Sequence, residues 1–176
     1  VTNGVYEVGG MVTPGYALTN RVCATNAITV QSVNGSEFTT IRGASSSGAN
    51  GALAIRGVYL SGGAVLDGFT VTNGYTMSSG EDFYEESGGG VLISTNGSVQ
   101  NCMISGNSCN YGAGGVGCIG GGTVVNCVIS GNDSGYGGGG AGCYGGGSLE
   151  NCTIFDNTSA LYAGGLYIRD IGSLNN

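Results

Sequence analysis

One seven-residue motif, Asn-Cys-x-Ile-x-x-Asn, occurs three times in this chain at a constant spacing of 25 residues. Its copies cover residues 101–107, 126–132 and 151–157. A Gly-Gly pair followed by an apolar residue keeps the same spacing, and its first glycine is Gly89, Gly114, Gly139 or Gly164. A regular period of this length is typical of solenoids, because one unit cannot bury its apolar face alone and stacked units can.

Within each unit, apolar residues alternate with small or polar ones over three stretches that are too short for a helix, as at 116–118, 124 and 127–129. We therefore expect three short strands per coil, with equivalent strands of successive coils paired in parallel about 4.8 Å apart. This predicts an all-β fold, a right-handed parallel β-helix of about seven coils. The expected inward columns are Val91, Val116, Ala141 and Leu166; Ile93, Cys118, Cys143 and Ile168; Cys102, Cys127 and Cys152; and Ile104, Ile129 and Ile154.

Two sets of asparagines keep the same period. Asparagine tolerates a left-handed backbone and bonds neighbouring backbone groups, so we expect the chain to turn at these positions. Stacked on themselves, the asparagines should form amide ladders. One set is Asn101, Asn126, Asn151 and Asn176, and the other is Asn107, Asn132 and Asn157.

The periodicity extends into the first half of the chain with wider spacing. Val58, Leu60, Phe69 and Val71 match Val91, Ile93, Cys102 and Ile104 at a shift of 33 residues. We expect a single domain over residues 1–176: irregular coils in 1–57, one coil in 58–87 with an inserted acidic loop at 75–87, and regular coils in 88–176. Residues 28–30 and 40–41 look like further strands.

Composition narrows the possible partners. The 39 glycines exclude an ordinary helical protein, and plentiful aliphatic residues indicate an ordered core. A net charge of −7, with four arginines and neither Lys nor His, argues against nucleic acid and against anionic membrane surfaces. No apolar run is long enough for membrane insertion. The chain begins with Val and no signal peptide precedes it, so we read it as a processed or trimmed piece of a soluble protein.

Seven cysteines raise the question of disulfides, although an odd count leaves at least one thiol unpaired within a monomer. Neighbours in one column, such as Cys118 and Cys143, lie near the separation that a disulfide tolerates. The same column also holds isoleucines, which favours buried free thiols. Cys109 falls in a turn, so we expect it to be exposed or bonded elsewhere. Without His or a Cys-x-x-Cys pair, a structural zinc site is not expected.

The Gly-Gly-[Ala/Val/Leu] and Ile-x-x-Asn pairs resemble the short repeats of polymorphic outer-membrane proteins, within the pectate-lyase-like β-helix group. The resemblance covers residues 88–176 and, more weakly, 54–74. It implies a secreted or surface-displayed β-helix of the kind found in adhesion or passenger regions. It does not imply catalysis.

Many β-helices act on acidic polysaccharides, so paired carboxylates or a calcium site would be informative. Asp133, Glu150, Asp156 and Asp170 occupy different positions of the coil and should not converge, so no catalytic residue and no cofactor is expected. The acidic run Glu81, Asp82, Glu85 and Glu86 is a weak cation candidate, and we favour a solvated loop. Glycines in 137–142 are read as tight corners, and Tyr111 with Tyr136 as surface packing in preference to a sugar site.

The two ends of the chain suggest an assembly. Residues 172–176 begin another repeat, and Val1-Thr2-Asn3-Gly4 matches residues 71–74. Either the chain is cut from a longer β-helix or subunits stack end to end, with Val1, Thr2, Asn3, Gly4, Leu174, Asn175 and Asn176 at the junction. The prediction is a non-catalytic, extracellular or cell-surface structural protein that binds itself in a head-to-tail filament. The alternatives are a polysaccharide-binding or polysaccharide-cleaving domain and an adhesin passenger fragment.

Overall fold

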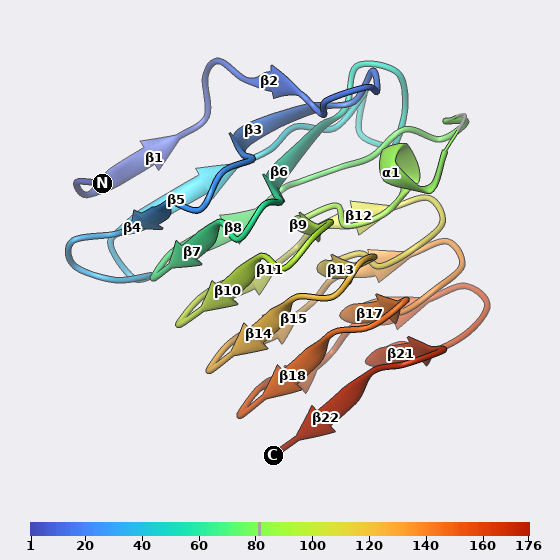
Figure 1. The fold of residues 1–176 in the computed structure, drawn as a ribbon. Helices are drawn as coiled ribbons and strands as arrows, with labels where there is room; N and C mark the ends of the chain where they lie inside the picture. The colour runs from blue at the N-terminus through green and yellow to red at the C-terminus, as the bar shows by residue number, and fades with distance from the viewer. Residues whose placement is uncertain (81) are drawn as a thin grey trace.

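A computed structural model describes residues 1–80 and 82–176. The described residues are all-β apart from one short helix, α1 (Phe83–Glu86). Figure 1 shows the strands of successive repeats lying in rows from the N-terminus to the C-terminus. In chain order they are β1 (Gly4–Tyr6), β2 (Met11–Val12), β3 (Thr19–Ala24), β4 (Thr29–Gln31), β5 (Thr39–Arg42), β6 (Ile55–Leu60), β7 (Val65–Asp67), β8 (Thr70–Thr72), β9 (Val91–Ile93), β10 (Ser98–Gln100), β11 (Met103–Ser105), β12 (Ser108–Cys109), β13 (Val116–Cys118), β14 (Thr123–Val125), β15 (Val128–Ser130), β16 (Asp133–Ser134), β17 (Ala141–Tyr144), β18 (Ser148–Glu150), β19 (Thr153–Phe155), β20 (Thr158–Ser159), β21 (Leu166–Arg169) and β22 (Ser173–Asn175).

The strands form four sheets, and neighbours within a sheet come from successive repeats. We name the sheets A (β1-β5-β8-β11-β15-β19), B (β2-β3-β6-β9-β13-β17-β21), C (β4-β7-β10-β14-β18-β22) and E (β12-β16-β20). Within the described chain, strands pair in parallel except β2 and β3 of sheet B, which are antiparallel. This parallel stacking is consistent with a β-solenoid.

The register confirms the columns read from the 25-residue period. Val116 lies beside Val91 on one side and Ala141 on the other, and Leu166 follows Ala141. The wider spacing in the first half is also confirmed, since Val58 pairs with Val91 and Val71 with Ile104. These columns form one continuous buried core that runs from Ala24 to Cys152.

Two details of the fold differ from the expectation. Each regular repeat contains a fourth strand of two residues, because the chain stays extended beyond Asn107 and Asn132 and pairs again in sheet E. The match between residues 1–4 and 71–74 does not reflect structural equivalence. Tyr6 pairs with Ile41, which pairs with Val71, so Tyr6 occupies the place expected for Val1. Val1 instead lies beside β4, where its ammonium donates to the Gln31 carbonyl at 2.6 Å.

The expected strands at 28–30 and 40–41 correspond to β4 and β5, which pair with β7 and β8. The inserted segment is partly ordered as α1, which Asp82 caps by accepting a hydrogen bond from the Tyr84 amide at 3.1 Å. In the described residues, no helix combines the length and the apolar character needed to cross a membrane.

Candidate functional site

The inner asparagine ladder is the most completely bonded polar feature of the stack. The Asn107 amide nitrogen donates to Asn132 Oδ1 at 2.9 Å, and Asn132 donates to Asn157 Oδ1 at the same distance. Each amide also donates to a carbonyl of the preceding repeat, and each Oδ1 accepts from a backbone N–H as well. Asn107 and Asn132 are buried. The predicted amide ladder is therefore confirmed at these positions.

The backbone expectation for this ladder was wrong. Asn107, Asn132 and Asn157 are not left-handed; the residue before each of them is, with φ of 63°, 62° and 52° at Gly106, Gly131 and Asp156. Placing the turn one residue earlier directs the asparagine side chain inward, where it meets its neighbours.

The outer asparagines behave differently. Asn101, Asn126 and Asn151 take the expected left-handed backbone, with φ of 55°, 52° and 49°. They are exposed, and Asn126 reaches Asn101 with one hydrogen bond of 3.4 Å. Their contribution is therefore mainly the turn. Asn176 holds Cys152 instead, accepting from its N–H at 3.0 Å and donating to its carbonyl at 2.9 Å.

All seven cysteines are free thiols in the structure. Cys102, Cys127 and Cys152 form one buried column, and Cys118 pairs in register with Cys143 in another. The hydrogen bond with the Cys143 thiol, together with burial, raises the pKa of Cys118. Buried thiols act as small apolar side chains, and the raised pKa makes the Cys118 thiol a poor nucleophile.

Cys109 corrects the expectation of an exposed thiol. It is buried, it donates to Ser134 Oγ at 3.4 Å, and burial raises its pKa to about 12. The fourth strand explains this position, because Cys109 and Ser134 are neighbours within sheet E and point inward. Cys23 is the half-buried thiol of the chain.

The acidic insertion is docked, which the sequence did not lead us to expect. Glu85 is 5% exposed and accepts a hydrogen bond from the Ala17 amide at 2.6 Å. Glu86 accepts from the Gly80 amide at 2.8 Å and is half-buried. Asp82 is exposed, and Glu81 lies outside the described residues. The solvated loop is thus wrong for Glu85 and Glu86, whose carboxylates bind backbone N–H groups.

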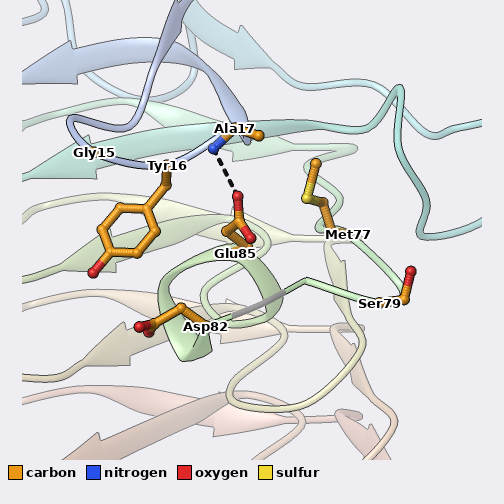
Figure 2. Close-up of a pocket in the computed structure, with 7 residues that line it drawn as sticks. All are labelled: Gly15, Tyr16, Ala17, Met77, Ser79, Asp82 and Glu85. Atoms are coloured by element: carbon orange, nitrogen blue, oxygen red, sulfur yellow. Dashed lines mark hydrogen bonds between the residues drawn. The ribbon is translucent and has the colours of Figure 1, made fainter.

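An open cavity of about 660 Å³ separates the insertion from the N-terminal loop. Figure 2 shows its lining, with the Tyr16 ring on one side and the Asp82 carboxylate below it. The Tyr16 ring stacks on Tyr84 at a centroid distance of 4.7 Å. Since Glu85 is engaged with Ala17, the cavity does not present two free carboxylates for acid and base catalysis.

Arg56 is the residue that sequence reasoning missed at this site. Its guanidinium is fully buried and donates to Thr13 Oγ1, Asn20 Oδ1 and the carbonyls of Ser87 and Gly88 at 2.9–3.1 Å, and also to the Tyr84 carbonyl. Burial lowers its pKa to about 9. The signal was present, because Arg56 interrupts an otherwise apolar strand whose following residues, 57–60, are all buried. It ties the N-terminal loop to the insertion.

An aromatic row follows the glycine corners. Tyr111 stacks on Tyr136 with centroids 4.4 Å apart and ring planes 10° from parallel, and Tyr162 meets Tyr136 edge-on at 4.8 Å. Because Tyr111 and Tyr136 cover one another's faces, those faces are not available to stack on a sugar. Surface packing is the arrangement observed.

The remaining carboxylates do not gather. Asp133 lies in β16 of sheet E and Glu150 in β18 of sheet C, while Asp156 and Asp170 follow strands of sheets A and B. The residues that the structure describes contain no cluster of three or more Cys, Asp or Glu side chains able to hold a metal ion.

The two ends of the stack are the surfaces that differ most from its middle. In one column of sheet C, Val99, Val124 and Leu149 are fully buried, while Leu174 is 47% exposed. In sheet B, Cys143 is buried and Ile168 is 38% exposed. At the N-terminal end the first twelve residues are all exposed, and β2 covers the edge of β3.

Comparison of the chain with protein-family models, with curated proteins and with solved structures finds no match.

Proposed function

We propose that the chain is a non-catalytic structural protein, a right-handed parallel β-helix of about seven coils whose subunits stack head to tail. The proposed binding partner is a second copy of this chain. An extracellular or cell-surface location follows from the resemblance of the Gly-Gly and Ile-x-x-Asn repeats to surface-displayed β-helices.

The strand order supports the coil count. Five successive sets of strands contribute one member each to sheets B, C and A, beginning with β3-β4-β5 and ending with β17-β18-β19. Two partial sets flank them, one with β1 and β2 and the other with β21 and β22. Five full sets and two partial ones make about seven coils.

The observation that carries the functional proposal is the exposure of column positions at the C-terminal end. Leu174, Ile168 and Ile154 continue columns whose inner members are buried, and they lose that burial because no further coil covers them. Edge strands also leave a row of backbone N–H and C=O groups unpaired, to which another strand can bind. A further coil stacked here would bury the exposed column side chains and pair these backbone groups.

The N-terminal end offers matching edges. In a head-to-tail stack β19 lies beside β1 in sheet A, and β22 lies beside β4 in sheet C. The apolar interior opens at this end through a cavity of about 180 Å³ lined by Val22, Val30, Ile41 and Phe69 among others. Side chains of about the size of Leu174 or Ile168 fit a space of this order.

Sedimentation velocity and negative-stain imaging of the purified chain test the proposal. The expected result is a concentration-dependent series of rods of constant width. A stable monodisperse monomer over the whole accessible concentration range would contradict it, and would favour the alternative in which further coils of one longer passenger chain cover this end.

A charge at the junction provides the matched comparison. Leu174→Lys places an ammonium on an exposed apolar position of the edge strand β22 and should prevent stacking. Met103→Lys makes the same change at a 40% exposed position in β11, in the middle of sheet A, and should leave stacking intact. Equal assembly of the two variants would show that the proposed junction is wrong.

A further inference from the structure

The N-terminal end carries a strand that does not belong to the parallel stack. β2 pairs antiparallel with β3 through two residue pairs, Met11 with Asn20 and Val12 with Thr19. It therefore covers the side of β3 that faces away from β6. Sheet A ends at this side on β1, which pairs with β5. Sheet C carries a smaller cover, because Val1 donates to the Gln31 carbonyl of β4 at 2.6 Å and accepts from the Val33 N–H at 2.9 Å.

That position matters for head-to-tail stacking. If β22 of one copy lies beside β4 of the next and β19 lies beside β1, then β21 of the first copy must lie beside β3 of the second. β2 already occupies this edge. Sheet A can continue across the junction as it stands, sheet C can continue once Val1 leaves the Gln31 carbonyl, and sheet B can continue only when β2 is displaced.

β2 pairs through fewer residues than the strand that would replace it. Met11 and Val12 are 60% and 50% exposed, and they make two residue pairs. Two side chains of β3 add bonds, Asn20 to the Met11 carbonyl at 3.0 Å and Arg21 to the Gly9 carbonyl. β21 pairs with β17 through four residues in the parallel arrangement that β3 uses toward β6. The exchange replaces a short antiparallel contact with a longer parallel one.

Thr13, directly after β2, is held in place and marks the point about which β2 can move. Thr13 is buried, its N–H donates to the Leu18 carbonyl at 2.9 Å, and its hydroxyl accepts from the buried Arg56 guanidinium at 3.1 Å. Residues 7–10 link β2 to β1 and are exposed. Movement of β2 between β1 and Thr13 breaks the bond of 3.0 Å from Asn20 Nδ2 to the Met11 carbonyl, and it leaves the bonds donated by Arg56 in place.

We infer that β2 is an edge cap that keeps the subunit from stacking, and that it is displaced from β3 when β21 of a neighbouring copy takes its place. This inference rests on the proposed head-to-tail function. It identifies β2 as the regulated contact of that junction, and the cost of displacing it sets the concentration at which assembly begins.

A reversible lock tests the displacement. Val12 and Thr19 face each other next to the hydrogen-bonded pair Thr13 and Leu18, so they form a non-hydrogen-bonded pair, whose close Cα atoms suit a disulfide. The double variant Val12→Cys/Thr19→Cys is made in a Cys23→Ser background, which removes the half-buried native thiol. Oxidised, it should remain monomeric at concentrations where the Cys23→Ser parent assembles, and a reductant should restore assembly.

A second variant loosens β2. A Cβ on Gly10 would lie 2.9 Å from the Asn20 carbonyl oxygen, so Gly10→Ala pushes β2 away from β3. Losing about one pair of backbone hydrogen bonds should lower the assembly concentration about tenfold. Leu53→Ala alters a 79% exposed residue outside the N-terminal segment and serves as the control.

The outcomes separate the inference from the function on which it depends. If the oxidised lock and Gly10→Ala assemble like their parents, stacking occurs but β2 is not its cap, and the inference is overturned alone. If no variant assembles at any concentration, the proposed function and the inference both fail.

Discussion

Asn132 provides a quantitative test of the ladder, because its side chain makes four hydrogen bonds in a fully buried position. It donates to the Ile104 carbonyl and to Asn157 Oδ1, and it accepts from the backbone and side-chain nitrogens of Asn107, all at 2.9–3.1 Å. Replacement by alanine removes all four bonds at once.

The magnitude follows from the groups left behind. The Asn107 amide keeps its bond to the Val71 carbonyl, and Asn157 Oδ1 keeps the Asn132 N–H. The Ile104 carbonyl and the Asn107 N–H lose the partners named above. Ile104 lies in the parallel ladder with β15, where its carbonyl retains a backbone partner, so only the Asn107 N–H is left without any partner. At about 1–3 kcal/mol for that N–H and about 1 kcal/mol for the bond lost by the carbonyl, the loss is about 3 kcal/mol. This is a large part of the roughly 5–15 kcal/mol that stabilises a typical domain.

Asn126 is the matched control, since it occupies the outer ladder one strand earlier. It is exposed and its backbone is left-handed, with φ of 52°. Asn126→Ala should cost about 1 kcal/mol, and Asn126→Gly should cost close to nothing because glycine accepts this backbone. Asn132→Gly should not be rescued in this way, because Asn132 is not left-handed.

Urea unfolding followed by circular dichroism measures all four variants. The reasoning predicts that Asn132→Ala and Asn132→Gly lose stability together and that Asn126→Gly retains it. A loss below about 1 kcal/mol for Asn132→Ala would refute the argument that the ladder leaves its neighbours unsatisfied.

Three further outcomes follow. Gly114→Ala would place a Cβ 2.3 Å from the Asp133 carbonyl oxygen and should lower the free energy of unfolding by about 3 kcal/mol or more. A Cβ on Gly131 meets nothing within 4 Å, so Gly131→Ala should lower it by about 1 kcal/mol because of its φ of 62°. Thermal unfolding measures both variants. An aromatic disulfide reagent should label one thiol, Cys23, before unfolding; rapid labelling of several would show that the buried columns open in the native state. The Cys109 thiol ionises near pH 9 when unfolded and near 12 when folded, so its contribution to stability is lost as pH rises from 9 to 12, by about 1.4 kcal/mol per unit. The pKa of Arg56, lowered to about 9, acts in the opposite direction over that range. Cys109→Ala should therefore reduce the alkaline loss in urea titrations, and an unchanged pH profile would contradict the assignment.

Periodicity was a reliable guide wherever the repeat is regular. The columns through Val116, Cys118 and Ile129 and the ladder through Asn132 were all predictable, because parallel in-register pairing places residues 25 apart side by side. The same logic matched Val71 of β8 to Ile104 through the shift of 33.

Features that depend on contacts between non-equivalent segments were not predictable. Arg56 lies in an apolar strand, and its buried charge is stabilised by hydrogen bonds to Thr13 and Ser87, which lie in two irregular segments. Glu85 looked solvent-exposed for the same reason, since its partner is the Ala17 amide of a distant loop. The antiparallel β2 was hidden because two residues carry no periodicity.

A cryo-electron microscopy reconstruction of the assembled protein tests the central claim most directly. The account predicts rods in which the strand ladder of sheet C runs without interruption from β22 of one copy into β4 of the next, with β2 displaced from β3 at every junction. Separate monomers, or rods whose subunits meet through other surfaces, would contradict it.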